Sequence, residues 1–137
     1  MEKKETYKLV VTRREAFEIE DEPEHTMMVV EMEGEPIDYQ VGVAGEFVSR
    51  RSVTIHDRVR GWGLMEGYVM ANFKNGSVYS RFKGSRDGLK KVTEGTWKTY
   101  LGTGSLAGTK GEGTFKLERA DKADQFILHI EGDYEAA

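Results

Sequence analysis

The chain has no cysteine and only two prolines among its 137 residues. Without cysteine it can form no disulfide, no thiolate metal site and no cysteine nucleophile. No run approaches the roughly 18–20 apolar residues of a membrane-spanning helix. The charged start MEKKETYKLV also lacks the apolar segment of a secretory signal. We therefore expect a soluble, cytoplasmic protein, and the length predicts one domain over residues 1–137.

Helical periodicity is absent as well, and strand-like alternation takes its place. In TMMVVEME, Met28, Val30 and Met32 fall on one face, and VTEGTWKTYL places Thr93, Trp97 and Leu101 together. Similar alternation marks GLMEGYVMANF and FILHIEGDY, while the runs near residues 7–12, 15–20 and 41–56 are less regular. The pattern predicts about eight strands and no βαβ units.

Turn signals separate these runs. The clearest is Asn75-Gly76, because Asn-Gly between two alternating runs is typical of a hairpin. The other predicted turns are Pro23, Gly34-Glu35-Pro36, Arg86-Asp87-Gly88, Gly102–Gly104 and Ala120–Asp124. Short strands at this spacing predict an all-β protein, either an antiparallel sandwich or a closed barrel. Of the two we favour a single eight-stranded antiparallel β-barrel.

The glycine-rich stretch YLGTGSLAGTKGEGTF, residues 100–115, could be read as a phosphate-binding loop. The order Gly108, Thr109, Lys110 does not fit a P-loop, and the third glycine of a dinucleotide fingerprint comes one position late. Such loops also lead into a helix, whereas GTFKLE looks like a strand. We therefore expect these glycines to serve bends and close backbone contacts of a barrel.

Three segments together resemble the allene oxide cyclase-like (dirigent-like) barrel superfamily, and most closely its uncharacterised bacterial members. They are GWGLMEGYVMANFKNGSVYSRFKGS, EGTWKTYLGTGSLAGTKGEGTFKLE and HIEGDYE, and the resemblance covers residues 61–134, roughly the C-terminal half of the chain. The resemblance implies an eight-stranded barrel with an apolar lumen open at one end, often dimeric or trimeric and without a cofactor. Plant members cyclise a fatty-acid epoxide or steer radical coupling. YKLVVTRREAFEIEDEP does not match their catalytic strands, so no catalytic residue is carried over.

Aromatic, methionine and aliphatic side chains are the candidates for an apolar binding pocket. They are Trp62, Met65, Val69, Phe73, Phe82, Trp97, Phe115 and Tyr134. Alternatively, these side chains pack the barrel solid, and the two interpretations weigh about equally.

The polar candidates for catalysis are Glu66, Tyr68 and Arg81, an acid, a phenol and a guanidinium on one predicted hairpin. We favour the alternative that all three point outward, because the opposite strand face is more uniformly apolar. The three histidines, His25, His56 and His129, show no metal-ligand spacing, so no metal site is expected.

Charge is unevenly distributed along the chain. Residues 1–48 carry a net charge of −8, residues 49–116 of +8 and residues 117–137 of −4. The strip SRRSVTIHDRVRGW, with Arg50, Arg51, Arg58 and Arg60, could bind nucleic acid. We favour cross-strand pairing of these arginines with the acidic N-terminal strands.

The sequence thus predicts a barrel that binds a small apolar or amphipathic molecule, without nucleic-acid or membrane partners. Two functional hypotheses remain. The barrel is either a cofactor-independent isomerase or cyclase, with Glu66, Tyr68 and Arg81 as its polar groups if they face the lumen, or a non-catalytic binding or structural module. Family resemblance also predicts a homo-oligomer, a dimer or trimer.

Overall fold

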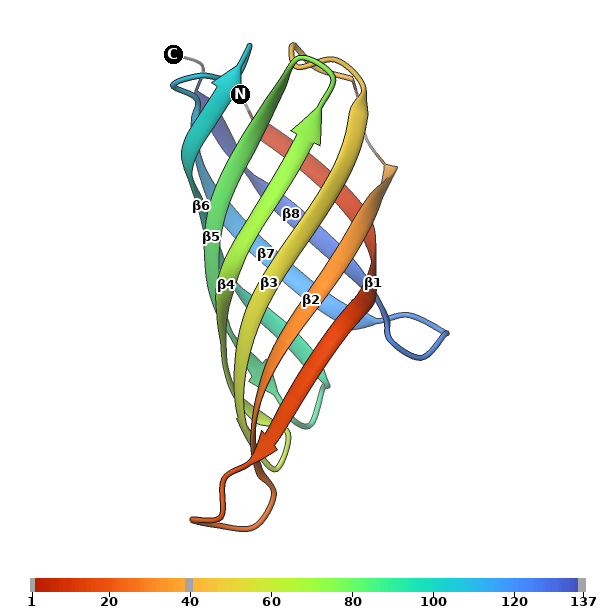
Figure 1. The fold of residues 1–137 in the computed structure, drawn as a ribbon, viewed down its shortest axis with the longest axis vertical. Coiled ribbons are helices and arrows are strands. Elements are labelled where there is room, and N and C mark those ends of the chain that lie inside the picture. Colours follow the sequence, from red (N-terminus) through yellow and green to blue (C-terminus); the bar gives the residue numbers. More distant parts are fainter. Residues whose placement is uncertain (1, 39–40, 136–137) are drawn as a thin grey trace.

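A computed structural model describes residues 2–38 and 41–135, and these residues form a closed eight-stranded antiparallel barrel (Figure 1). Each strand pairs with its neighbours in sequence, and β1 closes the barrel against β8. The strands are β1 (Glu2–Glu18), β2 (His25–Asp38), β3 (Phe47–Val59), β4 (Trp62–Phe73), β5 (Gly76–Asp87), β6 (Val92–Gly104), β7 (Lys110–Arg119) and β8 (Gln125–Glu135). The predicted fold class is confirmed. Among the described residues, no helix is long and apolar enough to cross a membrane.

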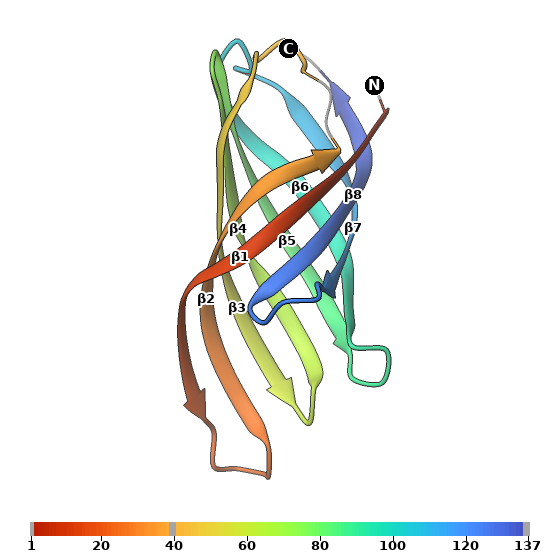
Figure 2. The same ribbon diagram turned by 90° about the vertical axis from the view of Figure 1, so that its right-hand side faces the viewer.

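The two ends of the barrel differ. Both termini lie at one end, here called the upper end, together with the β4–β5 and β6–β7 turns (Figures 1 and 2). At the lower end the β1–β2 hairpin projects furthest. It does so because β1 pairs with β8 only as far as Val10, whereas its pairing with β2 continues to Glu18.

The Asn75-Gly76 hairpin forms as predicted, although neither residue adopts the positive φ that motivated the prediction. Instead, the turn is held from the β2–β3 loop. The amide of Asn75 donates to Ala44 O at 2.7 Å, and the amide of Lys74 donates to Glu46 O at 2.9 Å.

The predicted turn at Gly34-Glu35-Pro36 is wrong, because these residues continue β2 and pair with β1. Proline is tolerated there because β2 pairs with β3 only as far as Gly34, which leaves Pro36 in a stretch with one hydrogen-bonded neighbour. The chain turns later, in the loop that contains the Gly42–Gly45 bridge.

Two predicted alternations are also interrupted. The runs near residues 7–12 and 15–20 belong largely to one strand, β1, whose pairing with β2 shifts register at Thr12. A second shift, between Tyr79 and Ser80 of β5, turns Leu101 outward, where it is 48 % exposed. Such bulges reverse the facing of the residues that follow them.

The core lies inside the barrel, in its middle and lower part. Its buried members include Leu9, Val30, Met65, Phe115 and Leu128, and Phe82 packs edge-on against Phe115 at 5.7 Å between ring centroids. Above this layer the interior is hollow.

Candidate functional site

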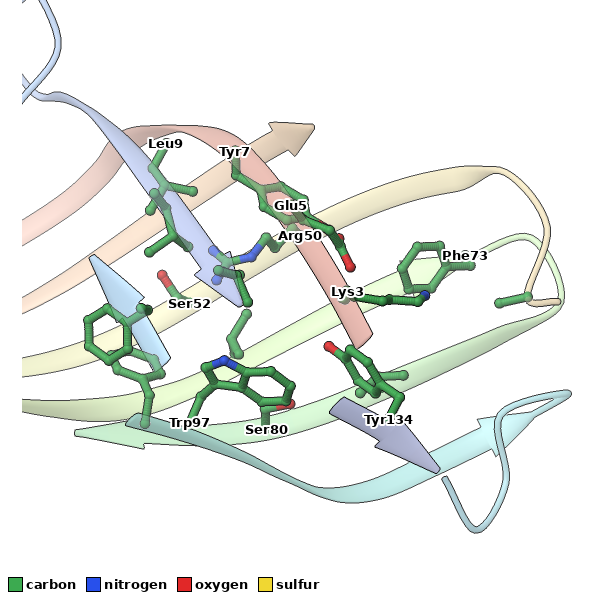
Figure 3. A pocket seen from close by; sticks show the side chains of 18 of the residues that line it. Lys3, Glu5, Tyr7, Leu9, Arg50, Ser52, Phe73, Ser80, Trp97 and Tyr134 are labelled. Atoms are coloured by element: carbon green, nitrogen blue, oxygen red, sulfur yellow. The ribbon is translucent and has the colours of Figure 1, made fainter. Parts of the chain in front are cut away.

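A cavity of about 430 Å³ occupies the upper part of the barrel interior (Figure 3). Its wall includes Leu9, Met32, Val78 and Ile130, and near the upper end Lys3, Leu106 and Thr109. The β2–β3 loop adds Val41 and Val43, which are 65 % and 78 % exposed, so the rim of the cavity is apolar as well. The volume lies within the range of small-molecule binding pockets.

Seven of the eight side chains predicted to bind a ligand line this cavity. They are Met65, Val69, Phe73, Phe82, Trp97, Phe115 and Tyr134. The eighth, Trp62, lies on the outer face of β4 and is 48 % exposed, with its indole against Gly88 of the β5–β6 turn. Trp62 has the parity of the outward residues Leu64 and Glu66, so alternation places it outside.

Trp97 is the largest of these wall residues, and hydrogen bonds hold its ring in place. Its indole Nε1–H donates to both Thr114 O and Glu131 O, each at 3.2 Å. The ring lies against Gly132, where any Cβ would collide with it, and 5.2 Å from the ring of Tyr134. With its only donor satisfied, Trp97 offers a ligand an apolar surface.

One charged side chain is buried within this wall. Arg50 of β3 is 6 % exposed and lines the cavity, and its Nη1 forms no hydrogen bond with any residue that the structure describes. Figure 3 shows it between Tyr7 on one side and Trp97 on the other, and its guanidinium lies 5.2 Å from the Tyr7 ring centroid. Burial lowers the pKa of Arg50, because removing the cation from water disfavours the charged form.

A phenol and a carboxylate accompany this arginine. The Tyr7 hydroxyl donates to Glu5 Oε2 at 2.6 Å, and both residues line the cavity (Figure 3). Burial first, and the Glu5 carboxylate second, raise the pKa of Tyr7, so its phenol stays protonated. The Glu5 carboxylate accepts a hydrogen bond from Tyr7 and is not within ion-pair distance of Arg50. The positive charge of Arg50 therefore has no direct ion-pair partner in Glu5.

Hydroxyl groups complete the polar part of the wall. Ser52 and Thr54 follow Arg50 on the inner face of β3, and the Ser80 hydroxyl is 2.9 Å from that of Thr99. Sequence reasoning missed Glu5, Tyr7 and Arg50 as site residues. One signal was available: the alternate positions of β3 from Arg50 to Arg58 are all polar, which marks one consistent face.

Glu66, Tyr68 and Arg81 lie outside the cavity, on the outer face of β4 and β5. Tyr68 is 50 % exposed, and the Arg81 guanidinium lies 6.0 Å from its ring and 5.4 Å from that of Tyr100. Glu66 is exposed and stands opposite Ile55 of β3. The condition set for their catalytic role, that they face the lumen, is therefore not met.

The three histidines lie apart from one another. His25 contacts Asp21 at 2.7 Å and Asp57 at 2.6 Å, and these hydrogen bonds raise its pKa. His129 contacts Glu118 at 3.0 Å, while His56 lies inside the barrel. Among the described residues, ligand atoms of Asp21, Glu22 and His25 lie within 4.8 Å of one another, but the two ring nitrogens of His25 are already engaged by Asp21 and Asp57.

The arginine strip divides between the two faces of β3 and the following turn. Arg51 and Arg60 point outward and meet acidic residues of the N-terminal segment, Glu31 at 2.6 Å and Glu22 at 3.4 Å. The favoured interpretation of cross-strand pairing holds for these two arginines. Within β3, Arg50 and Arg58 have the opposite parity to Arg51 and face inward.

Comparison with known proteins gives no relative: no family model matches the chain, and no curated protein matches it. The resemblance to allene oxide cyclase-like barrels and the homo-oligomer therefore stay predictions.

Proposed function

We propose that the barrel binds a small amphipathic molecule in its cavity, with the apolar part against the aromatic and aliphatic wall and an anionic group on Arg50. The observation that carries the proposal is a buried guanidinium with an unsatisfied Nη1 in a mainly apolar wall, whose other charged side chains are Lys3 near the upper end and Glu5, which accepts from the Tyr7 hydroxyl. An isolated buried charge is costly unless a counter-charge meets it.

A carboxylate is the best match for such a group. Guanidinium and carboxylate form two parallel charge-assisted hydrogen bonds, a geometry that a lone ammonium cannot reproduce. Ser52 is the next inward residue along β3, so its hydroxyl is placed to assist the carboxylate. Met32 and Met65 make the apolar wall adaptable in shape.

A cofactor-independent isomerase or cyclase is the second candidate, and one observation favours it. The trio of acid, phenol and guanidinium expected at Glu66, Tyr68 and Arg81 occurs in the cavity as Glu5, Tyr7 and Arg50. The Glu5 carboxylate, which the Tyr7 hydroxyl holds beside an anion-binding group, is placed to act as a general base. If the barrel is an enzyme, Glu5→Gln abolishes turnover while the variant still binds the ligand.

Calorimetric titration with decanoate and with decanol tests the binding proposal, because the two probes differ mainly in charge. We expect decanoate to bind the wild-type protein more tightly than decanol. In Arg50→Met, decanoate affinity falls at least about 30-fold, since losing one partner of a buried charge pair costs about 2–5 kcal/mol, and decanol affinity changes little.

Arg81→Met is the matched control, because it removes the same charge from the outer face. It should bind both probes as the wild-type protein does. Equal decanoate affinity in wild type and Arg50→Met would contradict the role of Arg50. Native mass spectrometry of gently purified protein is an independent test. A co-purified neutral hydrocarbon would contradict the proposal that the ligand is anionic.

A further inference from the structure

A group of basic side chains lies inside the lower end of the barrel, beyond the core layer and away from the cavity. It consists of Arg14, His56, Arg58 and Arg86, and none of these lines the cavity. His56 is 2 % exposed, Arg58 and Arg86 are half-buried, and the Arg14 side chain is 38 % exposed. The group is therefore reachable from solvent at its edge and buried at its base.

Strand register brings these residues together. His56 and Arg58 follow Thr54 along the inner face of β3, and Arg58 and Arg86 both pair with Gly63 from opposite sides. Because Gly63 has no side chain, nothing from β4 stands between the two arginines.

Arg14 reaches the same interior through the bulge at Thr12. After that extra residue, Arg14 stands opposite Val30, which is 2 % exposed and faces the core. Without the bulge, position 14 would face outward. All four side chains thus point into one end of the barrel.

The positive charge of the group is largely uncompensated. Arg14 forms an ion pair with Asp124 at 3.0 Å, but within residues 2–38 and 41–135 no carboxylate lies within ion-pair distance of Arg58 or Arg86. The carboxylates next to them in sequence are engaged elsewhere. Asp57 meets His25, and Asp87 accepts from the amides of Leu89 and Lys90.

The hydrogen-bond donors of the group are also incompletely used. Arg86 Nη1 donates to Gly61 O at 2.6 Å, and Arg58 Nη2 donates to His56 Nδ1 at 3.1 Å. Because Nδ1 accepts, the neutral imidazole carries its proton on Nε2. Both His56 Nε2 and Arg58 Nε are buried and form no hydrogen bond within the described part of the chain.

We propose that this end of the barrel is a second ligand site, for a phosphoryl oxyanion held chiefly by Arg58 and Arg86. A dianion neutralises both unpaired guanidinium groups, whereas a single carboxylate neutralises only one. Phosphoryl oxygens also offer several acceptors for the forked donors of arginine. The side chain of His56 contacts Arg58 from the interior of the barrel and acts as a positioning residue. The site is independent of the cavity and of any ligand there.

Titration with inorganic phosphate, against sodium chloride at matched ionic strength, tests this site. We expect saturable binding and a rise in Tm with phosphate. In Arg58→Gln and Arg86→Gln, the phosphate dissociation constant should increase at least about tenfold, since a hydrogen bond to a charged group is worth about 1.5–3 kcal/mol. Arg81→Gln on the outer face is the matched control and should bind phosphate normally.

Phenyl phosphate distinguishes the source of the anion. Tighter binding than inorganic phosphate, lost in the same two variants, assigns the site to a phosphate monoester, and equal or weaker binding assigns it to free phosphate. Phosphate affinity that is unchanged in both variants, or no saturable binding in the wild-type protein, overturns the proposal.

A measurement on the wild-type protein covers the case that a variant fails to fold. In ¹⁵N-labelled protein, phosphate should shift the Nε–H signals of Arg58 and Arg86 and the ring nitrogens of His56. Shifts confined to Arg50, or to exposed arginines such as Arg81, would contradict the assignment.

Discussion

Replacing Arg50 with methionine should stabilise the unliganded protein. Arg50 is 6 % exposed and lacks a carboxylate within ion-pair distance among the described residues. Taking an ion out of water costs several kcal/mol in a real protein, and replacing buried ions with apolar residues of similar volume is often neutral or stabilising by about 1–4 kcal/mol. Methionine keeps most of the side-chain volume and removes the charge.

One contact works against this gain. The Arg50 guanidinium lies 5.2 Å from the Tyr7 ring, and a cation–π contact of this kind contributes about 0.5–2 kcal/mol. The difference leaves a net stabilisation of about 1–2 kcal/mol in Arg50→Met. For a domain of this size, that corresponds to a rise in Tm of roughly 3–8 °C.

Urea unfolding and differential scanning calorimetry measure this change directly. Arg81→Met, which removes a guanidinium from the exposed rings of Tyr68 and Tyr100, should instead lose up to about 1 kcal/mol. A loss of more than about 1 kcal/mol in Arg50→Met would refute the reasoning, because it would mean that the protein itself already compensates the Arg50 charge. The same instruments separate the binding role of Arg50 from its cost in stability. Decanoate should raise the Tm of the wild-type protein and leave the Tm of Arg50→Met unchanged.

Two further predictions concern the lower end and the cavity wall. Burial, and next the positive charge of Arg58, lowers the pKa of His56 from 6.5 to about 4. On acidification the unfolded chain therefore takes up a proton on His56 near pH 6.5, whereas the folded protein takes it up only near pH 4. Because of His56, the free energy of unfolding should therefore fall by up to about 3 kcal/mol between pH 6.5 and 4, and the fall should be smaller by that amount in His56→Gln, as measured by urea unfolding at constant ionic strength; equal slopes in the two proteins would exclude His56 as the cause. Gly132→Ala should destabilise the barrel by about 1–3 kcal/mol, because the new Cβ would collide with Glu112 O and the Trp97 ring. Thermal unfolding measures this loss, and an unchanged Tm would show that Trp97 can move aside.

The barrel could be predicted from the sequence because alternation and turn chemistry act locally. Phe126, Leu128 and Ile130 alternate on β8 as the sequence indicates, and the Asn75-Gly76 hairpin forms where expected. Errors arise where tertiary contacts override a local signal. Pro36 reads as a turn residue, yet it fits a strand that lacks one hydrogen-bonded neighbour at that point.

The apolar wall of the site follows from the same alternation, since Met65, Val69 and Phe73 share a parity on β4. The wall does not determine whether the barrel is filled or hollow. That depends on how the side chains of all eight strands meet across the interior, and no single strand carries this information. Trp62 illustrates the limit, because its size suggested a pocket residue while its parity places it outside.

The polar residues of both proposed sites were missed for a different reason. Strand assignment conventionally turns the apolar face inward, but β3 does the reverse: Val53 and Ile55 face outward, while the inward positions from Arg50 to Arg58 are polar. Polar side chains that face inward on one strand of an otherwise apolar barrel add no hydrophobic stabilisation to the fold. Along this face β3 carries an arginine with an unsatisfied nitrogen toward each end of the interior, Arg50 and Arg58. The two proposed anion sites therefore share a single structural origin, the inverted pattern of β3.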